Sequence, residues 1–274
     1  MTRSSSTITG IDLGTLDLTP RKLSEAPPYK PRSFLLYGFA GVGKTLSAET
    51  WPEEMKIGII DHDVGVEVLG NNPRIEVWDC PSDPYNIPSE SYIKTNTILD
   101  ELISGKQQVD VLYMDSATTL QDIFMSQVIY KNKYSGRLPD GDMYRLMQKE
   151  VNNFIAKGLA AAEYLVWTAH VKEMRDVVGA THYAPAFSGQ QAMNIMCHFG
   201  EFYHCDVVGS GEERSWLWRT QPDKLYIARS RIRGLPLYVE PNFESLITTQ
   251  WWEGEHKSLE VGKKKGTTTK KEDK

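Results

Sequence analysis

Apolar and polar positions divide the chain into short buried runs that alternate with segments of helical period. Apolar runs predict strands at 33–37, 56–61, 74–79, 109–116 and 164–169. Segments of helical period predict helices at 46–50, 91–103, 117–130 and 143–162. Strands that alternate with helices predict an α/β fold, whose mostly parallel central sheet is covered by helices on both faces. Ligands of such folds bind at the carboxyl ends of the strands.

The pattern changes after residue 170. Residues 171–189 are polar and predict an irregular segment, which a short helix at 190–198 follows. Further β-like runs predict C-terminal antiparallel strands at 202–208, 215–220 and 224–228, with a Gly-Ser-Gly turn between the first two. A last short helix is predicted at 241–247.

The two ends of the chain differ in composition from the rest. Residues 1–32 are rich in Ser, Thr and Pro, and predict a flexible N-terminal arm. Apolar and acidic residues alternate at 11–13 and 16–18, where disorder is favoured over a strand that adds to a neighbouring subunit's sheet. Residues 251–274 predict a basic disordered tail. Residues 33–250 form the single predicted domain.

Composition is that of an ordinary water-soluble domain. The chain has 274 residues, of which 40% are hydrophobic and 24% charged, and no apolar run is long enough to span a bilayer. Three cysteines are too few for a disulfide scaffold, so a reducing cytoplasm is expected. The net charge of −5 excludes a protein that coats nucleic acid by bulk charge.

The strongest chemical signal is the run from Gly38 to Thr45, which reads G-x-x-x-x-G-K-T. It lies between a predicted strand and a predicted helix, as a P-loop requires. Glycines let backbone N–H groups surround a polyphosphate, and a helix N-terminus adds partial positive charge. The residues expected to bind the nucleotide are Gly38, Ala40, Gly41, Val42, Gly43, Lys44, Thr45 and Leu46. The motif predicts that the protein binds ATP or another nucleoside triphosphate.

Two residues are expected to hold Mg²⁺ beside the phosphates. Thr45 supplies a hydroxyl next to the P-loop lysine, and Asp115 ends a buried strand further along the chain. This is the position at which a Walker B carboxylate holds Mg²⁺ through water.

Polar residues also follow two other predicted strands. Asp61 and Asp63 flank His62, and on an extended strand end they would point to the same side. One carboxylate could orient the water that attacks the phosphate, and the alternative is a solvated acidic turn. His170 follows the fifth predicted strand and could contact the γ-phosphate or the water, although a lone histidine is more often structural.

These motifs occur in an order and spacing similar to the ATPase core of RecA and RadA recombinases. The resemblance covers residues 33–248 and is closest to the phage-encoded, core-only RecA-like ATPases. This phage nucleotide-binding AAA group includes single-strand annealing proteins. The resemblance implies a RecA-like P-loop NTPase core that hydrolyses ATP with Mg²⁺ in a host cytoplasm. The family's water-polarising carboxylate, usually Glu, falls on Asp63, and its polar sensor falls on His170.

A basic segment near the C-terminus extends this resemblance. Residues 228–236 are similar to the Lys-Asn-Arg-x-Gly segment of RadA-like and helicase ATPases, with one residue inserted before Gly234. The resemblance implies that Arg229 and Arg231 act as fingers on the nucleotide of a neighbouring subunit, in a homo-oligomer with shared ATP sites. The alternative is a solvated basic strand edge.

The resemblance also implies two loops that hold single-stranded DNA. The matching stretches interleave basic with aromatic residues, which suits phosphate contact and base stacking. Their basic residues are Lys131, Lys133, Arg137, Lys172 and Arg175. A separate single-strand-binding protein is a further expected partner, because the accessory DNA-binding domains of full-length recombinases are missing from this chain.

The leading hypothesis is therefore an ATPase that binds single-stranded DNA and promotes annealing or recombination in phage DNA metabolism. The main alternative is an ATPase switch or loader that acts on a protein partner without touching DNA. A nucleotide kinase is less favoured, because no arginine-bearing lid is evident. Zinc binding by the Cys and His pairs at 197–198 and 204–205 is disfavoured, since their spacing matches no common finger.

Overall fold

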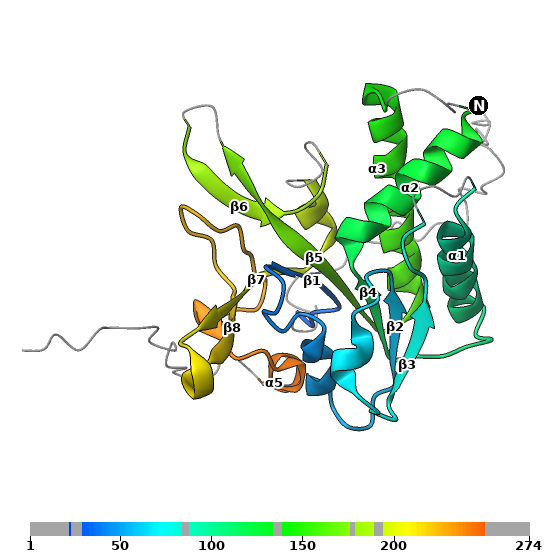
Figure 1. Cartoon of the computed structure of the whole chain (residues 1–274). Coiled ribbons are helices and arrows are strands. Elements are labelled where there is room, and N and C mark those ends of the chain that lie inside the picture. Colours follow the sequence, from blue (N-terminus) through cyan, green and yellow to red (C-terminus); the bar gives the residue numbers. More distant parts are fainter. Residues whose placement is uncertain are drawn as a thin grey trace, which may run out of the picture.

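The centre of the fold is a mostly parallel β-sheet, as predicted (Figure 1). The computed structural model describes residues 22, 29–83, 88–133, 139–175, 179–188 and 194–249. The parallel strands lie in the order β3-β2-β4-β5-β1-β7, and β8 and β9 extend the sheet antiparallel beyond β7. Their bounds are β1 Ser33–Gly38, β2 Ile57–Asp61, β3 Ile75–Asp79, β4 Val111–Asp115, β5 Tyr164–Arg175, β7 Glu201–Val208, β8 Ser215–Arg219 and β9 Tyr238–Val239.

Helices cover both faces of this sheet, and the two faces carry different kinds of helix. Three α-helices cover one face: α1 (Glu90–Ile103), α2 (Ala117–Lys131) and α3 (Gly141–Ala161). The other face is covered by short elements: the 3₁₀ helices η3 (Leu46–Thr50) and η4 (Val66–Leu69), and α5 (Phe243–Thr248). None of the helices in the described ranges is both long and apolar enough to cross a bilayer.

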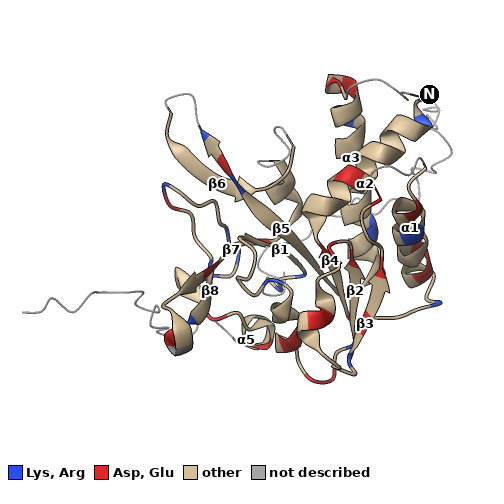
Figure 2. Ribbon diagram, in the orientation of Figure 1, with Lys and Arg blue, Asp and Glu red and all other residues tan. Residues whose placement is uncertain are grey.

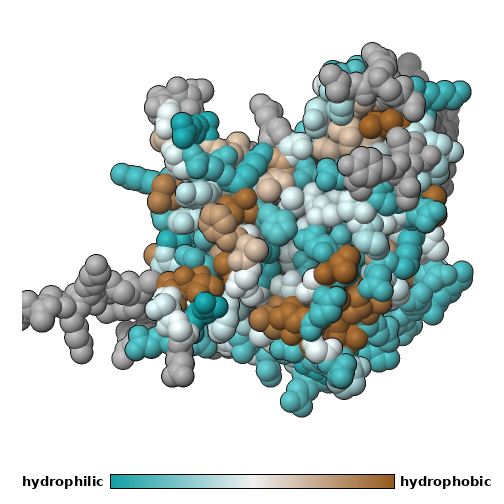
Figure 3. Space-filling view, viewed as in Figure 1, coloured by the Kyte–Doolittle hydropathy of each residue, from teal (hydrophilic) through white to brown (hydrophobic). Residues whose placement is uncertain are grey.

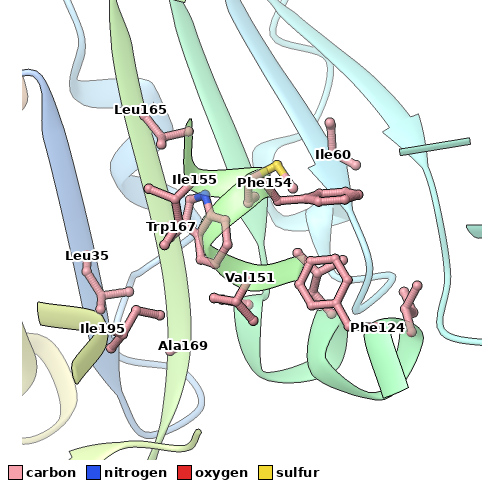
Figure 4. Packing of buried hydrophobic residues seen from close by; sticks show 14 of the residues in the cluster. Leu35, Ile60, Phe124, Val151, Phe154, Ile155, Leu165, Trp167, Ala169 and Ile195 are labelled. Carbon is pink, nitrogen blue, oxygen red and sulfur yellow. The ribbon is translucent and has the colours of Figure 1, made fainter. Parts of the chain in front are cut away.

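The core beneath the α-helices is densely packed (Figure 4). Trp167 on β5 lies beside Val151 and Ile155 of α3, and all three side chains are almost fully buried. Gly158 lets α3 approach β5 closely, because a Cβ there would stand 2.8 Å from the Leu165 side chain. The missing side chain therefore lets α3 pack directly against β5.

An aromatic cluster forms the core of the other face. Trp51 stacks on Phe243 with ring centroids 4.2 Å apart, and Phe34 meets both rings edge-on. Trp51 follows η3 directly and precedes Pro52, which prevents the helix from continuing. The face of the molecule drawn in Figure 3 is mostly hydrophilic, with separate apolar patches.

The prediction of an irregular segment at 171–189 was wrong for residues 171–175 and 181–185, which form strands. β5 continues past the sheet to Arg175 and pairs antiparallel with β6 (Thr181–Pro185). This β5–β6 hairpin leaves the body of the molecule in the same direction as α2 and α3, upward in Figure 1. A two-stranded ribbon forms by backbone hydrogen bonds between polar residues, so it shows no apolar run in the sequence.

The C-terminal predictions were confirmed in part. β7 and β8 lie where expected, and α5 begins at Phe243 with Asn242 as its N-cap. Residues 224–228 form no strand, since Tyr226 and Arg229 make only isolated bridges to other segments. β9 was not predicted. Of the helix expected at 190–198, the described part is the 3₁₀ helix η5 (Ile195–His198). A further 3₁₀ turn, η6 (Gly211–Glu213), connects β7 to β8.

The predicted terminal segments lie largely outside the described residues. The possible strand at 11–18 and the basic tail at 251–274 both fall there. The last residues of the predicted arm contact the domain: Lys30 Nζ lies 2.7 Å from Glu163 Oε1, and the Arg32 carbonyl accepts the N–H of Leu165. The arm and tail boundaries stay predictions.

Candidate nucleotide-binding site

The P-loop leaves the carboxyl end of β1, in the middle of the sheet. Gly41 and Gly43 have φ values of 77° and 81°, a left-handed conformation that glycine adopts without strain. Gly38 is required for a different reason, because a Cβ there would lie 2.5 Å from the Cys205 carbonyl oxygen on β7. The motif therefore forms the tight turn that the sequence predicts.

Lys44 is folded back into this turn. Its ammonium donates to the carbonyl oxygens of Gly38, at 3.1 Å, and Phe39, at 2.8 Å. Burial lowers the pKa of Lys44, although the nearby carboxylates of Asp115 and Asp63 oppose that shift. A buried amine with only carbonyl partners gains strongly from an anion, so Lys44 is well placed to bind phosphate oxygens.

The helix behind the P-loop is shorter than a typical P-loop helix. It is a 3₁₀ helix of 5 residues that ends before Trp51. The partial charge at a helix N-terminus comes from aligned peptide dipoles, so this short helix contributes less than a full α-helix would. Backbone amides of the loop and Lys44 therefore supply most of the positive potential.

Thr45 and Asp115 meet beside the P-loop. The Thr45 hydroxyl donates to Asp115 Oδ2 at 2.6 Å, and the Thr168 hydroxyl donates to Asp115 Oδ1. Burial raises the pKa of Asp115, because the buried carboxylate lacks enough positive charge to balance it. A hydroxyl and a carboxylate are hard oxygen ligands, and a divalent cation would supply the missing charge. The residues present thus fit Mg²⁺.

Asp63 lies in a polar cluster next to these residues. Its Oδ2 lies 3.2 Å from His170 Nε2, and its Oδ1 accepts a hydrogen bond from the Thr119 hydroxyl. Burial acts to raise the pKa of Asp63, but hydrogen bonds from His170, Thr119 and Ser116 outweigh it and lower the pKa to about 2. Asp63 is therefore a carboxylate that stays ionised at neutral pH.

Asp61 has a different role from the one its spacing indicates. β2 ends at Asp61 and the backbone then turns, so alternation no longer sets the direction of Asp63. Both oxygens of Asp61 accept backbone N–H groups, from Asp63 at 3.0 Å, Val64 at 2.9 Å and Gly65 at 3.1 Å. Asp61 thus fixes the turn that presents Asp63, and the two carboxylates do not act side by side.

The two candidate arginine fingers lie in different environments. The Arg229 guanidinium donates to the carbonyls of Met196 and Phe199, each at 2.6 Å, so it braces its own subunit. Arg231 is exposed, and its backbone N–H donates to the buried carboxylate of Glu201. These contacts do not support the finger role for Arg229, and the finger role of Arg231 stays a prediction.

Arg231 lies away from its own P-loop. Glu201, which holds its backbone, pairs with Phe34 near the start of β1, whereas the P-loop begins at Gly38. A strand rises about 3.3 Å per residue, so these positions are roughly 13 Å apart along β1. The backbone of Arg231 is therefore held toward the end of β1 that lies away from the P-loop of the same chain.

The basic residues predicted to bind nucleic acid do not form one continuous exposed surface in the described part of the chain. Lys131 pairs with Glu150 at 3.1 Å and bonds the Tyr92 hydroxyl, so it braces the α-helical layer. The Lys172 ammonium donates to the Phe187 carbonyl at the base of the hairpin. Lys133 and Arg175 are exposed. Arg137 lies outside the described residues.

Sequence reasoning missed two hydroxyl groups of this site. Thr119, in the first turn of α2, bonds Asp63, and Thr168 in the middle of β5 bonds Asp115. For Thr119 the available signal was the set of hydroxyl residues Ser116, Thr118 and Thr119 directly after the Asp115 strand. For Thr168 it was a polar residue within an otherwise apolar strand.

Fold and site together define a P-loop NTPase. A family model described as an AAA domain matches residues 30–232, and the chain belongs to this family. No curated protein matches the sequence.

Two solved structures show a loose likeness to this chain. The flagellar accessory protein FlaH from Methanocaldococcus jannaschii is 8% identical, with a TM-score of 0.33, over 69% of this chain and 78% of that one. A KaiC-like protein from Pyrococcus horikoshii is 13% identical, with a TM-score of 0.38, over 69% of this chain and 77% of that one. Values this low establish no shared function.

Proposed function

We propose that this protein is a Mg²⁺-dependent ATPase in which Asp63 orients the attacking water. The observation that supports this most is the Asp63 cluster. An ionised carboxylate is held by His170 and Thr119 close enough to the P-loop for its charge to act on Lys44. A solvated acidic turn would not be held by two side chains from other elements.

Each residue of the site has its own proposed role in binding and hydrolysing ATP. Lys44 binds the β- and γ-phosphates, and backbone amides from Gly41 to Gly43 surround them. Thr45 and Asp115 hold Mg²⁺, which neutralises charge on the phosphates when it is bound. A carboxylate with a pKa of about 2 is a weak base. Asp63 therefore orients and polarises the water rather than removing its proton before attack.

The test compares two aspartates by steady-state ATP hydrolysis. Asp63→Asn keeps the size of the side chain but removes its charge, and we expect kcat to fall about a hundredfold. Asp142→Asn is the matched control, because Asp142 is exposed, lies outside the nucleotide site in the first turn of α3, and forms a surface pair with Arg145. Equal activity of the two variants would overturn the role of Asp63.

We further propose that the β5–β6 hairpin couples this site to single-stranded DNA, and that the protein acts in annealing or recombination. His170 contacts Asp63 and is followed immediately by the outer half of β5. The hairpin carries exposed Arg175 and the Tyr183 ring. Figure 2 shows charges of both signs on this part of β5. A switch that acts on a protein partner is the alternative, and the mixed charge is the observation that favours it.

DNA binding separates these alternatives. Fluorescence anisotropy of a labelled oligonucleotide would compare Arg175→Ala with Arg145→Ala, since both arginines are exposed and each makes a surface pair. We expect Arg175→Ala, but not Arg145→Ala, to lower the affinity for DNA and to make that affinity less dependent on salt concentration. If the unmodified protein binds no DNA in the presence of ATP and Mg²⁺, the protein-partner alternative stands.

A further inference from the structure

A cavity of about 730 Å³ opens beside the P-loop. One wall comes from Gly43 and the residues of η3 that follow the loop, including Leu46 and Thr50. The opposite wall is the β7–β8 hairpin, and the segment Glu240–Asn242 closes one end. Its volume falls within the range of about 300–1,000 Å³ that small-molecule sites occupy.

Two parts of the cavity lining are joined by a hydrogen bond. Thr50 Oγ1 accepts the N–H of Phe243 at 3.1 Å, which joins η3 to the start of α5. Thr50 in turn donates to the Ser47 carbonyl at 2.8 Å. The η3 wall and the segment before α5 are therefore held together by the fold before any ligand binds.

Trp216 contributes an aromatic surface to this cavity. It shares a face of β8 with Trp218, whose ring is buried against Phe243 at a centroid distance of 4.7 Å. Trp216 lies two residues before Trp218, near the start of β8, and keeps 37% of its surface exposed. Whereas Trp218 packs on Phe243, the Trp216 ring packs on the backbone of Gly43. A Cβ at Gly43 would stand 3.0 Å from the Cδ1 atom of Trp216.

We propose that this cavity binds the nucleoside half of a purine nucleoside triphosphate, with the base stacked on Trp216. This inference rests on the proposed ATPase function and adds where the base binds and which bases are preferred. Gly43 belongs both to the phosphate-binding loop and to the cavity wall, so a nucleotide can fill both without a break. An indole stacks on the face of any base, and a purine offers the larger face.

Trp216 is one of the few large aromatic residues in the described part of the molecule that keep more than a third of their surface exposed. Most large aromatic side chains of the sheet are buried in one of its two cores. A tryptophan that is left partly exposed at a concave site next to a phosphate loop is instead typical of ligand contact. The absence of a side chain at Gly43 is what allows the ring to lie there.

The test measures binding of ADP, GDP, CDP and inorganic pyrophosphate with Mg²⁺ by calorimetry. These ligands lack the γ-phosphate of ATP, so binding is measured without hydrolysis. The proteins are the unmodified chain, Trp216→Ala, Trp216→Phe and Leu225→Ala. Leu225 is the control, since it is an exposed apolar residue that does not line the cavity. Pyrophosphate reports on the P-loop alone.

We expect Trp216→Ala to weaken ADP and GDP binding about tenfold or more, in line with the loss of one stacked base, and to leave pyrophosphate unchanged. Trp216→Phe should restore most of the affinity, and Leu225→Ala should change nothing. CDP should bind more weakly than ADP and lose less on Trp216→Ala.

Unchanged ADP binding by Trp216→Ala would overturn the inference and leave the ATPase proposal intact. Equal losses for CDP and ADP would overturn the purine preference. If the unmodified chain binds neither ADP nor pyrophosphate, the ATPase proposal itself fails and this inference fails with it.

Discussion

The Nε2 atom of His170 lies 3.2 Å from Oδ2 of Asp63. His170 is the last β5 residue that pairs with β1, opposite Gly38, and the outer half of β5 begins directly after it. A single residue thus links the carboxylate at the nucleotide site to the hairpin that projects from the sheet. The proposed coupling between the hairpin and the nucleotide site would act through this contact.

The first prediction concerns this contact. His170→Ala removes a hydrogen-bond partner of Asp63, so we expect kcat for ATP hydrolysis to fall about tenfold or more while ATP affinity stays unchanged. His170→Gln keeps a donor and should recover part of the loss. A proportional rise in KM without a change in kcat would contradict a positioning role.

The second prediction separates stability from activity at Asp115. Burial raises the pKa of Asp115 in the folded protein, so its charge destabilises the fold at neutral pH. Asp115→Asn removes that charge and keeps polar atoms for Thr45 and Thr168. We expect an unchanged or higher Tm in metal-free buffer, together with loss of Mg²⁺-dependent hydrolysis. A clearly lower Tm would show that the charge is stabilising.

The third prediction concerns acid stability. Burial lowers the pKa of both His62 and His204 to about 4, and both remain neutral in the fold. In the unfolded chain each takes up a proton as pH falls through about 6.5. Lowering pH from 7.5 to 5.5 should therefore reduce the free energy of unfolding by about 1 kcal/mol for each histidine. This loss stops growing only when pH falls below about 4, where the folded form also binds the proton.

His204→Phe tests this directly by urea unfolding at the two pH values. His204 stacks on Tyr226 with centroids 4.0 Å apart, and a phenyl ring can occupy the same place. The variant should lose about 1 kcal/mol less than the unmodified protein between pH 7.5 and 5.5. His198→Gln changes an exposed histidine and serves as the control. Identical pH dependence in all three proteins would refute the role of His204.

The fourth prediction tests a site shared between subunits. The Lys44→Ala variant keeps Arg231 but lacks a functional P-loop. The Arg231→Ala variant keeps the P-loop but lacks the candidate finger. If Arg231 acts on a neighbour's nucleotide, each variant alone should be inactive and a mixture should regain part of the ATPase activity. Arg233→Ala, which changes another exposed arginine of the same turn, is the control. A mixture no more active than its components would contradict the shared site.

Much of this site could be predicted from the sequence because it is local. The P-loop is a contiguous motif, and Asp115 and His170 stand where apolar runs end or nearly end. Parallel strands bring such positions to one edge of the sheet, whatever the details of the loops. For this reason the parallel strand arrangement and the placement of Asp115 near Thr45 followed from the pattern alone.

The features that escaped prediction depend on contacts between distant segments. Trp216 reaches Gly43 only because β8 pairs with β7, and nothing near Trp216 in the sequence indicates that neighbour. The resemblance implied a finger role for Arg229, but its guanidinium donates to the carbonyls of Met196 and Phe199 at the end of η5. The β5–β6 hairpin has no apolar run, because a ribbon away from the core needs none.

Steady-state ATP hydrolysis with and without single-stranded DNA tests the central claim most directly, with Lys44→Ala as the blank. The proposed function predicts Mg²⁺-dependent hydrolysis that single-stranded DNA stimulates and that Lys44→Ala abolishes. Hydrolysis that depends on Lys44 but not on DNA would contradict the coupling through the hairpin. If the unmodified protein hydrolyses ATP no faster than Lys44→Ala under any of these conditions, the assignment as an ATPase is contradicted.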